Sequence, residues 1–201
     1  MSGEKLAVVE AFYTIQGEGA NTGRAAYFIR LAGCDVCCAW CDARESWAAG
    51  RYEQQSVESI VEGVRAAGAR TVVITGGEPL MHNLDELTRA LHRMGCEVLL
   101  ESSGSHPLSG EFDWICISPK RRKMPMAWAY GAASELKMVI SGAEDFTLAR
   151  ECAQRVGEGC RLYLQPEWSV AKEVMDLIVE YVKANPRWRV SLQTHKYMEI
   201  P

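Results

Sequence analysis

Three cysteines near the start of the chain have a spacing suited to an iron–sulfur cluster. They are Cys34, Cys38 and Cys41, in the pattern Cys-x3-Cys-x2-Cys, with a further thiol at Cys37. A structural cluster normally takes four cysteine ligands, so three ligands on one short loop leave one iron of a cubane cluster open to another molecule. An open iron can bind and reduce a ligand. The loop therefore predicts redox catalysis rather than a structural metal.

Zinc is the alternative metal, because soft thiolates also select Zn²⁺ and Cys37 raises the local number of thiols to four. Structural zinc usually draws its ligands from two separated parts of a chain, whereas these four thiols lie within eight contiguous residues. We therefore favour the cluster and interpret Cys37 as a spectator, with zinc or no metal as the alternatives. The other cysteines are isolated in apolar or helical surroundings that are typical of core thiols: Cys96, Cys116, Cys152 and Cys160.

Size and charge bound the class of protein. The 201 residues, 48% of them hydrophobic, can bury one core but are short for a complete eight-fold barrel of roughly 250 residues. A net charge of −4 gives no electrostatic footprint for nucleic acid, and we interpret the basic run at 120–123 as a solvated loop or a contact to an anionic substrate. No signal peptide or membrane-spanning stretch is apparent. The clustered cysteines suit a reducing cytosol, so we expect one cytoplasmic domain, residues 1–201, that binds neither nucleic acid nor membrane.

Apolar runs along the chain predict a parallel sheet. Runs that read as buried strands occur at 27–31, 71–75, 97–100, 114–117, 136–140, 162–164 and 189–192. Amphipathic helices are expected around 57–64, 84–94, 144–156 and 170–181. Strands alternating with helices indicate parallel pairing, while the Gly- and Pro-containing connections 102–113 and 118–134 predict little helix. We therefore expect an α/β fold: an incomplete, TIM-like partial barrel with mostly parallel strands and reduced helices, rather than an open doubly wound sheet.

Polar motifs follow the ends of the predicted strands, where parallel barrels gather their ligands. The cysteine loop follows the first strand, and the others are the segments 75–79 (Thr-Gly-Gly-Glu-Pro), 101–104, 118–120, 165–167 and 193–196. We expect Gly76 and Gly77 to let a ligand approach the backbone closely, and Glu78 to accept a hydrogen bond from an ammonium group. Beside an open iron, these motifs describe a pocket for a ligand that carries an amino acid.

The cysteine loop, with Trp40 before its last cysteine, and the Thr-Gly-Gly-Glu-Pro segment resemble the motifs of the radical S-adenosylmethionine superfamily. The resemblance implies a 4Fe-4S cluster held by Cys34, Cys38 and Cys41, with S-adenosylmethionine chelating the fourth iron. One electron from the reduced cluster then cleaves the sulfonium to a 5′-deoxyadenosyl radical. The cofactor carries the difficult chemistry, so no protein residue is predicted to be catalytic in its own right.

Three further segments resemble the 7-carboxy-7-deazaguanine synthase family: 12–19, 28–34 and the ending 193–201, Gln-Thr-His-Lys-Tyr-Met-Glu-Ile-Pro, so the likeness covers nearly the whole chain. That family converts 6-carboxy-5,6,7,8-tetrahydropterin to 7-carboxy-7-deazaguanine with loss of ammonia, on the route to queuosine. The resemblance implies hydrogen abstraction from the pterin carbon bearing the carboxylate, ring contraction, and return of the hydrogen to the cofactor. It also implies an electron donor such as flavodoxin or ferredoxin, and a homodimer.

Site residues carry over from the resemblance position by position. Substrate contacts are implied for Ile15, Gln16, Gly17, Arg30, Thr75 and the Pro201 carboxylate. Contacts to S-adenosylmethionine are implied for Gly77, Glu78, Ser118, Pro119, Lys120, Gln165, Pro166, Glu167 and Trp168. Arg30 suits a substrate carboxylate because its planar fork binds one bidentately; a surface ion pair is the alternative. Three residues are candidates either for bonding the pterin ring or for a structural role: Glu18, Glu101 and His195.

The chain departs from the family after its last cluster cysteine, where Asp-Thr is common and the threonine helps to hold Mg²⁺. Here the pair is Asp42-Ala43. Alanine offers no oxygen, whereas Mg²⁺ requires oxygen ligands and often keeps several waters. Any magnesium ion is therefore expected to be held through substrate and water, with Asp42 in the outer shell.

Two other functions compete with this interpretation. A glycyl-radical activase shares the cluster motif and the small size, but would leave the C-terminal motif unexplained. A zinc or iron–sulfur protein without turnover, such as an electron carrier, would not cleave S-adenosylmethionine.

Overall fold

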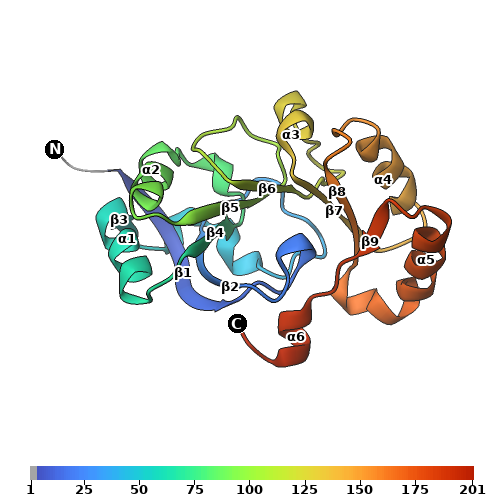
Figure 1. Ribbon diagram of the computed structural model, residues 1–201, viewed down its shortest axis with the longest axis horizontal. Helices are drawn as coiled ribbons and strands as arrows, with labels where there is room; N and C mark the ends of the chain where they lie inside the picture. Colours follow the sequence, from blue (N-terminus) through green and yellow to red (C-terminus); the bar gives the residue numbers. More distant parts are fainter. Residues whose placement is uncertain (1–3) are drawn as a thin grey trace.

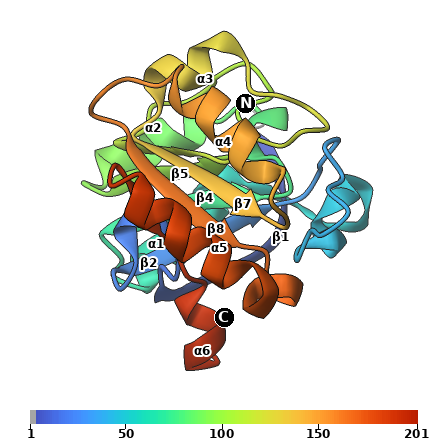
Figure 2. The ribbon, with the colours of Figure 1, turned by 90° about the vertical axis from the view of Figure 1, so that its right-hand side faces the viewer.

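The computed structural model describes residues 4–201 and consists of one mixed sheet with helices on its outer side (Figures 1 and 2). The sheet has nine strands in the order β3-β1-β2-β4-β5-β6-β7-β8-β9. The strands are β1 (Lys5–Ile15), β2 (Ala25–Leu31), β3 (Gln54–Ser56), β4 (Thr71–Gly76), β5 (Glu97–Ser102), β6 (Trp114–Ile117), β7 (Glu135–Ile140), β8 (Arg161–Pro166) and β9 (Trp188–Val190). The helices are α1 (Val57–Ala66), α2 (Asp85–Arg93), α3 (Ala127–Ala132), α4 (Asp145–Ala153), α5 (Ala171–Ala184) and α6 (Thr194–Met198).

Strand pairing divides the sheet into a parallel part and an antiparallel edge. The strands from β2 through β9 pair in parallel, each with its neighbour in the order above. The long strand β1 pairs antiparallel with both β2 and β3, and its register to β2 shifts between Val8 and Glu10. Among residues 4–201, β3 and β9 lie at the two ends of the order and do not pair with each other. The sheet is therefore an unclosed barrel, as the sequence predicts.

Burial explains why these segments form. Strands β4 and β5 are covered on both faces, which is the usual state of parallel strands and accounts for their near-continuous apolar composition. Helix α1 starts where the Ser56 hydroxyl accepts a hydrogen bond from the Ser59 N–H, and it buries Val57, Ile60 and Val64 against the sheet. In Figure 1, α1 and α2 flank one end of the sheet and α4 and α5 the other. The cavity-side face of the sheet carries the polar residues described below.

All seven predicted strands and all four predicted helices are confirmed, with boundary differences of a few residues. The pattern missed β1, because residues 6–8 are all buried and residues 9–15 do not alternate cleanly between buried and exposed positions. It also missed β3, whose three residues are polar and partly exposed. The connection 118–134 contains the short helix α3, and the terminal segment contains α6. Within residues 4–201, no helix combines the length and the apolar character required to cross a bilayer.

Candidate active site

A single cavity of about 400 Å³ lies at the carboxyl ends of the parallel strands, a volume typical of small-molecule sites. Every predicted site residue except Pro119 lines it. Pro119 is buried between Ser118 and Lys120, and both of these neighbours do reach the cavity. The strand map therefore correctly predicted that the motifs gather in one place.

The three predicted cluster cysteines face the cavity from the loop after β2. Cys34, Cys38 and Cys41 line it as free thiols, whereas Cys37 does not. The Cys37 backbone has a left-handed φ of 49°, and its thiol donates to the Cys34 carbonyl oxygen at 3.4 Å. This geometry leaves three thiols for a cluster and turns the fourth into the loop.

The thiols fit a cluster better than they fit a single ion. In the part of the chain that the structure describes, no three His, Cys, Asp or Glu side chains converge on one metal position. A cubane places its thiolates on three different irons, so its ligands need not converge. Burial raises the pKa of Cys34 and of Cys38, and the nearby Lys120 ammonium opposes the rise at Cys38. Iron binding must therefore displace thiol protons.

Close packing of the neighbouring backbone requires glycine at both glycine positions of the Thr-Gly-Gly-Glu-Pro segment. Gly76 has a φ of +148°, and a Cβ there would lie 2.1 Å from the Leu31 carbonyl oxygen. A Cβ on Gly77 would lie 2.4 Å from the Gly33 carbonyl oxygen and 2.7 Å from the Cys34 Cβ. The sequence suggested that these glycines admit a ligand. The structure shows that the backbone leading into the cysteine loop packs directly against both glycines, where a side chain would not fit.

Glu78 is almost fully buried and already accepts several hydrogen bonds. One carboxylate oxygen accepts from the Leu80 N–H at 3.1 Å and the Ser102 hydroxyl at 2.6 Å. The other accepts from the Ser103 N–H at 2.8 Å and from the Ser103 hydroxyl. Glu78 therefore ties the end of β4 to the end of β5, in addition to lining the cavity.

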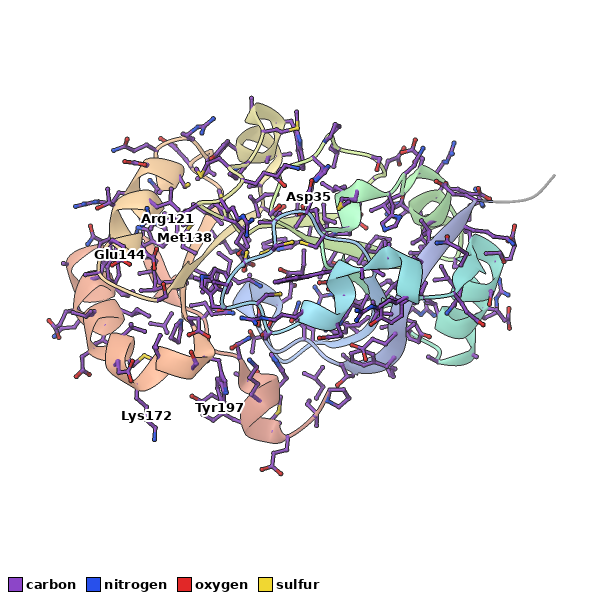
Figure 3. All side chains as sticks on the ribbon, turned by 180° about the vertical axis from the view of Figure 1, so that it is seen from behind. Asp35, Arg121, Met138, Glu144, Lys172 and Tyr197 are labelled. Carbon is purple, nitrogen blue, oxygen red and sulfur yellow. The ribbon has the colours of Figure 1, made fainter. Side chains whose placement is uncertain are left out.

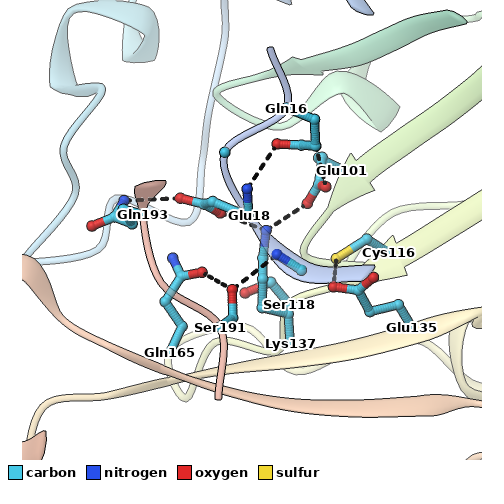
Figure 4. A network of polar contacts seen from close by, with 12 residues as sticks. Gln16, Glu18, Glu101, Cys116, Ser118, Glu135, Lys137, Gln165, Ser191 and Gln193 are labelled. Atoms are coloured by element: carbon cyan, nitrogen blue, oxygen red, sulfur yellow. Dashed lines mark hydrogen bonds and ion pairs between the residues drawn. The ribbon is translucent and has the colours of Figure 1, made fainter. Parts of the chain in front are cut away.

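The floor of the cavity is a network of buried charges (Figure 4). The Lys137 ammonium, on β7, donates to Glu18 at 2.6 Å and to Glu101 at 2.9 Å. The Gln193 amide donates to Glu18 at 2.9 Å, and the Gln16 amide donates to Glu101 at 3.3 Å. These contacts join the loop after β1, strands β5 and β7 and the segment before α6 in one network.

The network controls ionisation at the site. Burial alone would raise the pKa of Glu18, but the charge and hydrogen bond of Lys137, helped by Gln193, lower it to about 2. Burial would also raise the pKa of Asp42, and the hydrogen bond from Gln193 with the charge of Lys196 lowers it instead. Burial lowers the pKa of His195. At neutral pH the site thus holds two ionised carboxylates beside a neutral imidazole.

Arg30 and the C-terminal residues form one wall of the cavity. Arg30 donates through Nε to Glu10 at 2.7 Å, in a cross-strand pair, and also lines the cavity. The Thr14 hydroxyl donates to the Pro201 carbonyl oxygen at 3.2 Å. The Thr194 N–H and hydroxyl both donate to the Gly17 carbonyl oxygen, at 2.9 and 3.0 Å. The terminal segment is therefore docked on the loop after β1 and is not a frayed tail.

The opposite wall is built from the ends of β6 and β8. Lys120 donates to the Ser118 hydroxyl and carbonyl, and its ammonium lies 5.3 Å from the centre of the Trp40 ring. Gln165 accepts from the Ser191 hydroxyl at 2.8 Å. Trp168 packs edge-on against Tyr197, with 5.4 Å between ring centres. This wall thus contacts both the cysteine loop and α6.

The basic run 120–123 is largely paired. Arg121 donates to Asp145 at 3.1 Å and to the Glu144 carbonyl at 2.6 Å, and Figure 3 shows Arg121 and Glu144 close together. Lys123 pairs with Asp35 at 2.6 Å, and Arg122 donates to the Cys37 carbonyl at 3.0 Å. The run therefore braces the cysteine loop, and Lys120 alone of the four reaches the cavity.

Several cavity residues were not identified from the sequence. The clearest is Lys137, a charged residue inside the apolar strand Glu135–Ile140 and nearly completely buried. Charged residues are almost never buried without partners, so a lysine within an apolar strand could have indicated a functional position from the sequence alone. Trp47 also lines the cavity, but no motif distinguished it.

Comparison with known proteins gives consistent results. The model of the radical SAM superfamily matches residues 28–115. A 7-carboxy-7-deazaguanine synthase of Flavobacterium psychrophilum is 50% identical over 99% of this chain and 94% of its own length. The Synechocystis enzyme of that name is 46% identical over 96% and 92%. The crystal structure of QueE from Escherichia coli superposes with a TM-score of 0.84 at 31% identity, covering 94% of this chain and 93% of that one. Taken with the cavity, these matches show that the chain belongs to the 7-carboxy-7-deazaguanine synthase family of radical S-adenosylmethionine enzymes.

Proposed function

We propose that this protein converts 6-carboxy-5,6,7,8-tetrahydropterin to 7-carboxy-7-deazaguanine with release of ammonia, as a radical S-adenosylmethionine lyase of 7-deazapurine (queuosine) biosynthesis. The observation that carries the proposal is one cavity that joins the three cysteines to a charged polar floor and to Arg30. A glycyl-radical activase would not explain why the terminal segment is docked against the cavity. An electron carrier would have no use for the floor.

Cys34, Cys38 and Cys41 would hold the 4Fe-4S cluster. When bound, the reduced cluster and S-adenosylmethionine supply the radical that removes hydrogen from the pterin carbon bearing the carboxylate. The chain's own part is to bind and orient both ligands and to exclude water. The residues proposed to line the S-adenosylmethionine side are Gly77, Glu78, Ser118, Lys120, Gln165, Pro166, Glu167 and Trp168, with Pro119 buried behind them.

Ile15, Gln16, Gly17, Arg30, Thr75 and Pro201 form the proposed substrate side. Arg30 is the residue suited to the substrate carboxylate, because a guanidinium fork matches a carboxylate in charge and in geometry. Its contact with Glu10 uses Nε, and an Arg side chain has four further N–H donors on its terminal nitrogens.

For magnesium we propose a site held through the substrate carboxylate and water. Ala43 lines the cavity but its side chain carries no oxygen and its carbonyl oxygen already accepts from Ser46, while Asp42 accepts from Gln193 and Lys196. Asp42 is therefore suited to the outer shell of the ion. Chelation of Mg²⁺ should lower the turnover rate, and its return should restore it. A rate that responds to neither would refute magnesium use by this chain.

We propose further that the chain acts as one domain over residues 1–201, in a reducing cytoplasm and as a homodimer, with a flavodoxin or ferredoxin as electron donor. All eight cysteines are free thiols, which supports a reducing compartment. The dimer and the donor rest on the family alone. Light scattering of the purified protein and electron-transfer assays with each donor would test them.

The deciding experiment is an anaerobic turnover with reconstituted protein, S-adenosylmethionine, a reductant and 6-carboxytetrahydropterin, followed by mass spectrometry. We expect 7-carboxy-7-deazaguanine from the native chain and none from Cys38→Ala. Cleavage of S-adenosylmethionine without that product would indicate another substrate. No cleavage by protein with a full iron complement would favour a carrier.

A further inference from the structure

Lys137 is a buried cation that the reaction outlined above does not use. Its side chain is 6% exposed and extends from β7 into the floor of the cavity. It forms ion pairs with Glu18 and Glu101, which come from two other elements of the fold (Figure 4). A buried lysine with two carboxylate partners is costly to desolvate, so its position needs a reason beyond packing.

The arrangement leaves the two carboxylates ready to accept from a ligand. Within residues 4–201, Glu18 accepts from Lys137 and Gln193 on separate oxygens, and Glu101 accepts from Lys137 and Gln16 in the same way. Each carboxylate oxygen can accept about two hydrogen bonds. Both carboxylates therefore keep acceptor positions, and with one cation between them the trio carries one net negative charge.

A ligand that fits this floor presents several N–H donors along one planar edge. The 2-amino-4-oxopyrimidine half of a pterin has such an edge, and the deazaguanine product keeps the same half. We propose that Lys137 is a positioning residue that holds Glu18 and Glu101 in place as a pair of hydrogen-bond acceptors for the aminopyrimidinone edge of substrate and product. This inference rests on the proposed function and assigns the orientation of its substrate, with the carboxylate end toward Arg30.

Removing the cation should leave two carboxylates that repel each other in a buried site, so that protonation of one of them becomes more favourable. Other titratable groups face the trio: Asp42 in the cysteine loop, Cys116 on β6, Lys120 after it, Glu135 on β7 and His195 on α6. Because these groups remain in the variants, the informative quantity is the ratio of variant to native affinity at each pH.

The test is binding of 7-carboxy-7-deazaguanine to the reconstituted protein by calorimetry, between pH 6 and pH 9. We expect Lys137→Met to weaken binding about 10- to 100-fold near pH 7, the loss of one charge-assisted hydrogen bond. The affinity of Lys137→Met should approach that of the native chain as the pH rises and the second carboxylate ionises. In Lys137→Met/Glu101→Gln, which removes the repulsion between the two carboxylates, the ratio should depend less on pH than it does in Lys137→Met. Iron content and S-adenosylmethionine binding should stay native in both.

Equal affinity of Lys137→Met and the native chain at every pH would overturn the inference, as would a ratio independent of pH in the single variant. If Lys137→Met does not fold, Glu18→Gln and Glu101→Gln, each of which retains Lys137, replace it. Unchanged affinity in both would equally overturn the inference. A native chain that cleaves S-adenosylmethionine but neither binds this product nor forms it would instead refute the proposed function.

Discussion

Residue spacing alone pointed to Cys34, Cys38 and Cys41 as the predicted cluster thiols, and the structure adds a reason for the glycine beside them. A Cβ at position 77 would overlap the Gly33 carbonyl oxygen at 2.4 Å. We expect Gly77→Ala to destabilise the fold by about 1–3 kcal/mol, the usual cost of overpacking, and to lower iron incorporation because the cysteine loop must move. Denaturant unfolding and iron analysis check this. Gly50→Ala, in the same loop with nothing within 4 Å of the new Cβ, is the matched control.

Cys37 offers a second residue-scale prediction. Its thiol bonds to the Cys34 carbonyl and lies outside the cavity, so Cys37→Ser should retain iron, the visible spectrum and turnover within about twofold, since a hydroxyl can donate the same bond. Cys38→Ser should lose all three. A Cys37→Ser protein without a cluster would show that the loop uses four thiols.

At the scale of elements, α6 closes the proposed substrate side of the cavity, because Thr194 at its start bonds to the loop after β1. Thr194→Ala removes the hydroxyl that donates to the Gly17 carbonyl at 3.0 Å while leaving the backbone bond. Losing such a bond costs about 0.5–1.5 kcal/mol, so KM for the pterin should rise by about two- to tenfold. The rate of S-adenosylmethionine cleavage without substrate should not change. Thr147→Ala, on α4 and away from the cavity, should leave both unchanged; equal KM values in the two variants would argue against docking by α6.

The elements also show how far the sequence can be interpreted. Apolar runs and turn residues were sufficient to predict the parallel strands and to predict that the motifs after these strands meet at one edge of the sheet. They failed for β1, where Glu10 interrupts the run and is matched by Arg30 on the next strand. They also failed for the floor, because the pairing of Lys137 with Glu18 and Glu101 joins residues 119 and 36 positions apart. Spacing along a chain does not encode which buried charges meet across a barrel.

At the scale of the whole molecule, the buried carboxyl group of Glu135 should make the free energy of unfolding depend on pH in an unusual way. Burial, followed by the charge of Glu101, raises the pKa of Glu135 from 4.5 to about 7. A raised carboxyl pKa contributes stability below pH 4.5 that is lost as the pH rises through 7. By linkage the loss is of the order of 3 kcal/mol. Glu135→Gln removes this titration, so it should gain stability relative to the native chain between pH 5 and pH 8.

Urea unfolding of the metal-free, reduced protein at several pH values measures the difference. The exposed substitution Glu158→Gln should follow the native curve. Parallel curves for Glu135→Gln and the native chain would mean that the carboxyl group titrates at its ordinary pH. The Ala20 N–H, which donates to Glu135 at 2.9 Å, still finds an oxygen acceptor in glutamine.

The contact between Gly17 and Thr194 also has a consequence for biosynthesis. These residues are 177 positions apart, so this wall of the cavity cannot form while the ribosome still holds the last part of the chain. The contacts of the cysteine loop with β2 and the end of β4, by contrast, lie within the first 80 residues, and only its contacts with the run 120–123 follow later. Domains form progressively from the N-terminus during synthesis. A nascent chain would thus display its thiols in an open cleft before the wall arrives, and that interval is when a cluster is most easily delivered.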